Sequence, residues 1–67
     1  MMQNLISLVT CLGQAKGKDD KAQHVAFILT VYKTDEIMAL IKANDTWQGD
    51  IGAGSRIMAK VLYQLGD

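Results

Sequence analysis

The chain has 67 residues, and its seven basic and seven acidic side chains give a formal net charge of zero at pH 7. A chain of this length forms one small domain, residues 1–67, with little interior. Its apolar content of 49% therefore predicts that some apolar surface lies in an interface with a protein partner or in a homodimer. The balanced charge disfavours capture of nucleic acid by bulk electrostatics, because non-specific DNA affinity comes mainly from phosphate neutralisation.

The cysteine count and the hydropathy pattern indicate the compartment. The single cysteine, Cys11, excludes an internal disulfide and fits a reducing environment. No apolar run reaches the roughly 18 residues that span a bilayer, and the N-terminus lacks a basic leader. We therefore expect a cytoplasmic protein with no membrane partner.

Apolar residues recur at helical spacing near the N-terminus and predict an amphipathic helix over residues 3–12. We expect Cys11 to be a small core residue beside this apolar stripe. Gly13 can end the helix, and a polar segment, 15–20, follows, whose closing aspartates can cap the next helix. The stripe consists of Leu5, Leu8, Val9 and Leu12.

Residues 20–33 fit a helix, although the apolar run 25–32 would also suit a buried strand. Helix is favoured, because no second strand is evident that could pair with this one. Thr34, followed by two acidic residues, predicts the start of another helix, while one uninterrupted helix over 20–43 is the alternative.

The last third of the chain predicts a loop followed by a helix. Residues 44–54 contain three glycines, so we expect a loop that Asn44 opens. Ser55 would cap the final helix and Gly66 would end it. The fold class is therefore all-α, with three to four short helices. The expected buried side of the last helix is Ile57, Val61, Leu62 and Leu65, and the expected dimer surface lies on residues 5–12 and 25–32.

The sequence predicts no enzyme, because it offers no convergent acid, base and nucleophile. His24 is expected to be solvated or close to a helix cap. No His, Cys, Asp and Glu grouping has metal-ligand spacing, so we expect no metal, cofactor or small-molecule substrate. The glycine-rich segment 49–56 could bind an anion at a helix N-terminus, but it lacks the Lys-Ser/Thr of a nucleotide loop.

Polar residues on the last helix fall on one face and suit contacts with phosphates and base edges. The alternative is an ordinary solvated helix surface, which zero net charge favours. The candidate DNA-binding residues are Arg56, Lys60, Tyr63 and Gln64, with Lys16, Lys18 and Lys21 as an auxiliary phosphate-binding patch.

Two stretches of the second half carry a family resemblance. The stretches are Lys33-Thr34-Asp35-Glu36-Ile37 and, beyond a polar loop, Ser55-Arg56 with Leu62-Tyr63-Gln64-Leu65-Gly66. Over residues 33–66 the chain resembles the segment near the C-terminus of phage and plasmid primase-helicases of the virulence-associated E type. The resemblance implies a helix-turn-helix-like C-terminal half and a regulatory or replication-accessory protein of a phage or plasmid that contacts DNA.

A second hypothesis is a compact protein-binding module, such as a phage-type inhibitor or adaptor, that acts through its apolar surface. Trp47 and Phe27 are the candidate partner-binding residues, because large aromatic side chains are enriched in interfaces. Trp47 could instead fold back over the core. Basic residues gathered on one face would favour DNA, and basic residues interleaved with acidic ones would favour a protein partner.

Overall fold

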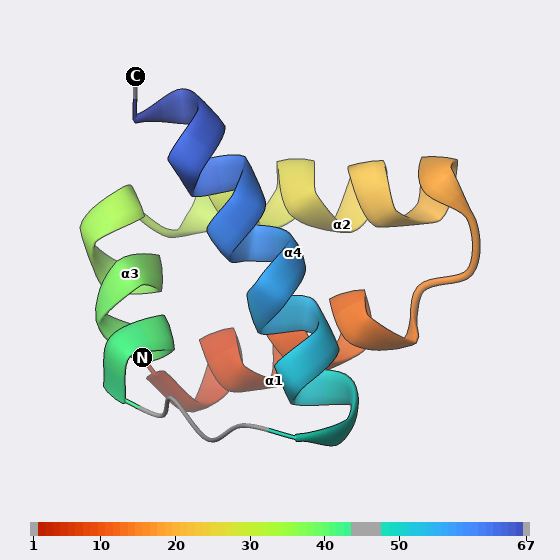
Figure 1. Ribbon diagram of the computed structural model, residues 1–67, viewed down its shortest axis with the longest axis horizontal. Coiled ribbons are helices and arrows are strands. Elements are labelled where there is room, and N and C mark those ends of the chain that lie inside the picture. Colours follow the sequence, from red (N-terminus) through yellow and green to blue (C-terminus); the bar gives the residue numbers. More distant parts are fainter. Residues whose placement is uncertain (1, 44–47, 67) are drawn as a thin grey trace.

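The computed structural model describes residues 2–43 and 48–66, and these residues form four α-helices without any strand (Figure 1). The helices are α1 (Met2–Gln14), α2 (Lys18–Val31), α3 (Thr34–Ala43) and α4 (Gly49–Leu65). The predicted all-α fold is confirmed, and so is the helix over most of residues 25–32.

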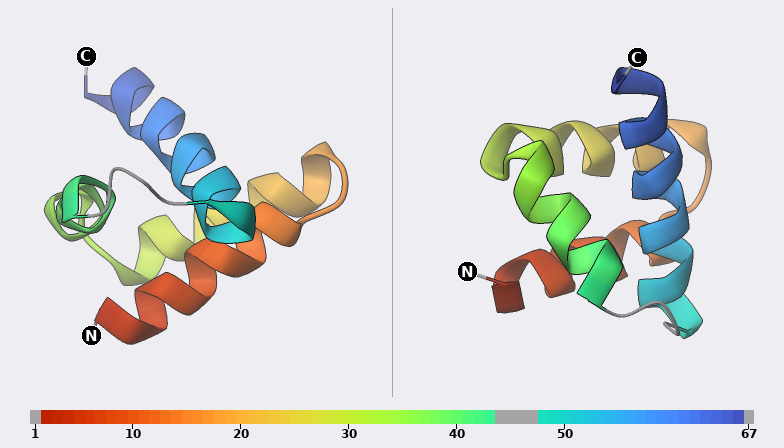
Figure 2. Two further views of the ribbon diagram at one scale, coloured as in Figure 1. Left: turned by 60° about the horizontal axis from the view of Figure 1, so that its bottom comes forward. Right: turned by 60° about the vertical axis from the view of Figure 1, so that its left-hand side comes forward.

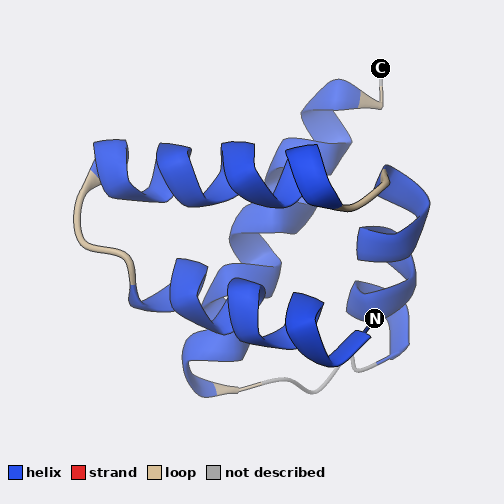
Figure 3. Ribbon diagram, turned by 180° about the vertical axis from the view of Figure 1, so that it is seen from behind, coloured by secondary structure: helices blue, strands red, loops and turns tan. Residues whose placement is uncertain are grey.

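The first two helices form one layer, and the last helix crosses it. α1 and α2 run in opposite directions and lie one above the other when the molecule is seen from behind, with α4 passing diagonally beyond them (Figure 3). α3 closes one side of this arrangement (Figure 1). The most extensive contact between any two helices joins α1 to α4, while α3 meets α4 over a much smaller area.

α2 begins and ends two residues earlier than the helix predicted over residues 20–33. Gly17, with φ of 85°, precedes its first residue, and Asp20 reaches back so that its Oδ2 accepts a hydrogen bond from the Lys16 backbone N–H at 3.2 Å. The predicted aspartate cap is therefore wrong: both aspartates lie in the first turn. After Val31 the backbone is extended at Tyr32 (φ −119°, ψ 145°), which excludes one helix over 20–43.

α3 begins at Thr34, as predicted, but Thr34 is not its cap. The side chain of Glu36 turns back, and its Oε1 accepts a hydrogen bond from the Lys33 backbone N–H at 3.0 Å. The Lys33 carbonyl in turn accepts from the backbone N–H groups of Glu36 and Ile37. This is the returning half of a capping box, which leaves Thr34 as the first helical residue.

The predicted loop over residues 44–54 is wrong in its second part, because α4 already begins at Gly49. Ser55 consequently lies inside the helix, where it is buried, and caps nothing. The glycine-rich segment 49–56 is therefore helical and does not form a loop. Gly66 ends the helix as predicted, with its N–H donating to the Leu62 carbonyl at 2.8 Å. Asn44 and Trp47 lie outside the described residues.

Glycines in α1 and α4 explain why residues 49–55 are helical. A Cβ atom on Gly54 would overlap the Val9 carbonyl oxygen, and a Cβ on Gly13 would overlap the Asp50 carbonyl oxygen. The two helices therefore approach each other so closely that their backbones touch, which only a residue without a side chain permits. The glycines mark a helix–helix contact rather than a loop.

The core draws on all four helices. α3 contributes Ile37 and Leu40. In α4, Leu62 is buried as predicted, but Leu65 is 64% exposed, and Met58, which lay outside the predicted side, is fully buried. The close contact with α1 turns a different side of α4 inward. The buried apolar residues are Leu5, Val9, Leu12, Ile28, Tyr32, Ile37, Leu40, Met58 and Leu62.

Two further predictions about the first helix are wrong. Cys11 is exposed, on the side of α1 that also carries Asn4 and Ser7, and is not a core residue. The apolar stripe of residues 5–12 packs into the chain's own core, so it does not offer a dimer surface. Of residues 25–32, only Phe27 and Val31 present large apolar side chains to solvent.

Candidate functional site

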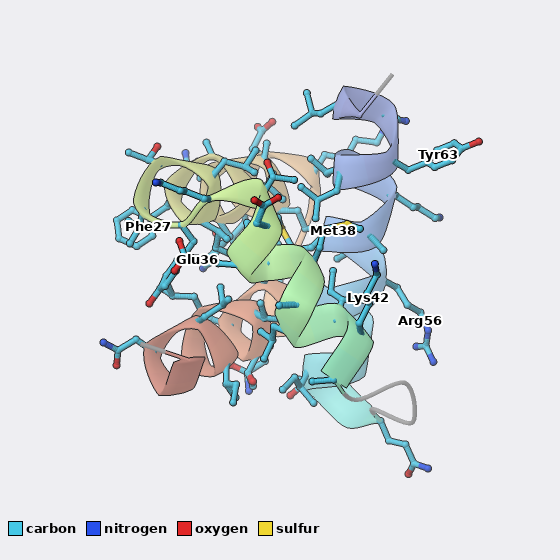
Figure 4. The ribbon with its side chains drawn as sticks, turned by 90° about the vertical axis from the view of Figure 1, so that its left-hand side faces the viewer. Phe27, Glu36, Met38, Lys42, Arg56 and Tyr63 are labelled. Atoms are coloured by element: carbon cyan, nitrogen blue, oxygen red, sulfur yellow. The ribbon has the colours of Figure 1, made fainter. Side chains whose placement is uncertain are left out.

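The four predicted DNA-binding residues of the last helix are all exposed on α4. Their spacing of four, three and one residues places them along one side of the helix. Arg56 and Tyr63 both project away from the body of the molecule (Figure 4). Asp50, the acidic residue in the first turn of α4, is engaged by α1 instead, because its Oδ2 accepts a hydrogen bond from the Gln14 side-chain Nε2 at 3.0 Å. The structure therefore brings Arg56, Lys60, Tyr63 and Gln64 together.

The three lysines proposed as an auxiliary patch do not join this surface. Lys16, Lys18 and Lys21 are exposed in the α1–α2 turn and the start of α2, beside Asp19 and Asp20. That turn and the C-terminal half of α4 lie on opposite sides of the molecule (Figures 1 and 2). The basic residues among the DNA-binding candidates thus form two separate groups, and acidic residues interleave one of them.

A groove lies between α3 and the C-terminal half of α4, with a volume of about 770 Å³. Ala39 of α3 and Ala59 of α4 line it with small side chains, while Met38 and Leu62 supply bulkier apolar walls. We call this surface the α3–α4 groove. It is lined by Thr34, Asp35, Met38, Ala39, Ile41 and Lys42 of α3, and by Ala59, Leu62, Tyr63 and Gly66 at and beyond the end of α4.

The two ends of the α3–α4 groove differ in charge. Asp35 lies in the first turn of α3 and Lys42 in its last turn, so they line opposite ends of the groove. Arg56 of α4 extends to the same side of the molecule as Lys42 (Figure 4). Within the described parts of the chain, no ion pair engages these three side chains. The groove is therefore apolar along its length, acidic at one end and basic at the other.

Apolar side chains outside the groove are also exposed. Phe27 is 55% exposed and Val31, one turn later in α2, is 52% exposed. The second half of α2 is rich in apolar residues, yet Ile28 is the one fully buried residue of this helix among those described. Phe27, the predicted partner-binding residue, is therefore accessible, whereas Trp47 lies outside the described residues.

Polar groups elsewhere offer little chemistry. His24 is half-buried, and its Nδ1 lies 2.8 Å from the Asp20 carbonyl oxygen, which is a local helix contact. Ser55 Oγ is buried without a hydrogen-bond partner among the described residues. No cluster of three or more His, Cys, Asp and Glu side chains there could hold a metal ion. None of the described helices has the length and apolar character needed to cross a membrane.

The groove was missed in the sequence because its most important residues are small. Ala39 and Ala59 look like ordinary helix formers, and nothing in their spacing shows that they face each other. Exposed Met38 gave a partial signal, since methionine is common on adaptable binding surfaces. Comparison of the chain with protein-family models, with curated proteins and with solved structures found no match.

Proposed function

We propose that this protein is a non-enzymatic protein-binding module that holds its partner in the α3–α4 groove. The observation that carries the proposal is the groove itself, an apolar channel with exposed Met38 and Tyr63 on its walls. Exposed apolar surface of this kind, bordered by polar residues, is typical of binding sites for other proteins. Zero net charge supports a protein partner over a polyanion.

A matched pair of variants tests this proposal. Ala59→Glu places a charge in the α3–α4 groove, and Ala26→Glu places the same charge on the exposed side of α2. Both positions are solvent-exposed, so both variants should fold. The three proteins are immobilised and used to capture proteins from extracts of the cells that produce the chain. A protein retained by wild type and by Ala26→Glu, but lost with Ala59→Glu, would support the proposal; its absence would contradict it.

A second candidate function is favoured by the exposed face of α4. Arg56, Lys60, Tyr63 and Gln64 share one side of this helix, and Lys42 of α3 extends to the same side of the molecule as Arg56 (Figure 4). In this alternative the protein is a small regulatory or replication-accessory protein of a phage or plasmid. Its α3 and α4 would form a helix-turn-helix-like half with α4 contacting DNA.

Fluorescence anisotropy separates the two candidates. Labelled single- and double-stranded DNA is titrated with the protein at low and at physiological salt. Saturable binding that weakens with salt and falls on joint substitution Arg56→Ala and Lys60→Ala would favour DNA contact. Lack of binding at low salt, or unchanged affinity in the double variant, would eliminate that assignment of the α4 face.

A further inference from the structure

We infer that the occupant of the α3–α4 groove is an amphipathic helix of a partner protein, with acidic residues in its first turn and basic residues in its last. The inference rests on the proposed function and goes beyond it by naming the partner's shape, charge pattern and direction. Its basis is the size of the groove, the nature of its walls and the charges at its two ends.

The size of the groove suits a short helix. α3, which forms one wall, has ten residues and is therefore about 15 Å long. A helix of about three turns has the same length. Both walls are helical, and apolar side chains on successive turns of a partner helix can pack between them, as in other helix-in-groove complexes.

The floor of the groove suits close packing of a helix. Ala39 lines the groove from α3 and Ala59 lines it from α4, and their small side chains leave room for a bulky apolar side chain of the partner. Met38 can adjust its flexible side chain to whatever enters, and Tyr63 can cover it with an aromatic ring. An extended peptide would leave its backbone N–H and C=O groups without partners along these walls, because helices have no free edge to pair with.

The charges at the groove ends fix the direction of the partner helix. Helices are most stable with acidic residues in the first turn and basic residues in the last turn. Lys42 and Arg56 lie toward one end, and Asp35 lies at the other. The acidic N-terminal turn of the partner therefore lies beside Lys42 and Arg56, and its basic C-terminal turn beside Asp35. The partner helix runs parallel to α4 and antiparallel to α3.

Two synthetic stapled helices of about eleven residues test this inference. They share one apolar stripe and one composition, but the first has two glutamates in the first turn and two lysines in the last, whereas the second has one glutamate and one lysine in each of these turns, so that neither of its ends carries a net charge. Both stapled helices are designed to be helical, so their intrinsic stability does not decide the comparison. We expect wild-type protein to bind the first peptide about five-fold more tightly or better, measured by anisotropy at physiological salt.

Charge-reversal variants of equal net charge locate the effect. Joint substitution Lys42→Glu and Arg56→Glu should abolish the preference between the peptides. Joint substitution Lys18→Glu and Lys21→Glu, at the far end of the molecule, should leave the preference intact. Ala59→Glu should weaken both peptides because it fills the groove. Circular dichroism of each variant verifies that it remains helical.

Several results would overturn the inference. Equal affinity for the two peptides, binding of neither, or a preference that persists in the Lys42→Glu and Arg56→Glu variant would each do so. A wild-type dimer in light scattering that Ala59→Glu converts to a monomer would assign the groove to a second copy instead. If the peptides show no preference but Ala59→Glu still loses a captured protein, the inference fails and the proposed function stands.

Discussion

The two sides of α4 are built on opposite principles. Toward α1, Gly54 lets the helices approach until backbone meets backbone, and no added atom fits. Toward α3, small residues have the contrary effect: Ala39 and Ala59 leave space that nothing in the described chain fills. Small residues thus occur on both sides, glycine where the backbones of α1 and α4 touch and alanine where the groove stays open. The two interfaces of α4 differ in extent, because many residues of α4 contact α1 and only a few contact α3.

The largest expected effect comes from the closed side. Gly54→Ala should lower the free energy of unfolding by about 3 kcal/mol or more, because the new Cβ overlaps the Val9 carbonyl and the helices must separate. A domain of this size has a total stability of only about 3–10 kcal/mol, so the variant should be largely unfolded or close to it. Urea denaturation followed by circular dichroism measures the change. Gly66→Ala, at the end of α4, is the matched control and should change stability by less than about 0.5 kcal/mol.

Ser55, which follows Gly54 in α4, should give a smaller change in the free energy of unfolding, and in the opposite direction. Ser55→Ala should raise the free energy of unfolding by about 1 kcal/mol, because it removes a buried hydroxyl without a hydrogen-bond partner in the described chain and adds a better helix former. Ala22→Ser, the reverse exchange at an exposed position of α2, measures the helix-propensity part and should change stability by less. Destabilisation by Ser55→Ala would show that its hydroxyl has a structural role.

The side of α4 that borders the α3–α4 groove should tolerate substitution with little loss of stability. Met38→Gln preserves the length of a side chain that is 37% exposed, so its cost in unfolding free energy should stay below about 0.5 kcal/mol. Its effect should appear instead as weaker binding of the helical peptides described above. A loss of stability comparable with that of Gly54→Ala would mean that the groove is part of the core, and the contrast between the two sides would disappear.

The smallest effect is expected at the outer side of α1. Cys11→Ser should leave the urea midpoint unchanged, because the thiol is exposed and faces away from the crossing with α4. In the folded wild-type protein, Cys11 should react with a thiol reagent nearly as fast as in urea. Slow reaction in the folded state would place Cys11 in the core after all.

Much of the fold could be predicted from local signals. The apolar spacing of Leu5, Val9 and Leu12 identified the first helix, and the acidic residues after Thr34 identified the start of the third. The error over residues 49–55 came from glycine. Gly49 and Gly54 predict a loop by local propensity, but a long-range contact with α1 overrides that preference. Ser55, taken for a cap, was displaced into the helix by the same contact.

The candidate site could be predicted only in part. The exposed face of α4 followed from helical spacing, so Arg56 and Lys60 were found in the sequence. The α3–α4 groove was not, because it depends on the angle between two helices, which the positions of Ala39 and Ala59 in the chain do not reveal.

The pairing of α1 with α4 also ties together segments from opposite ends of the described chain. During synthesis, α1 leaves the ribosome before α4 exists, so Leu5, Val9 and Leu12 stay without their principal covering until residues 54–62 have emerged. Contacts between distant segments slow folding, since the intervening chain must be ordered before they form. We therefore expect a nascent chain that ends before Gly54 to remain unfolded and sensitive to protease, and folding to occur in a single late step.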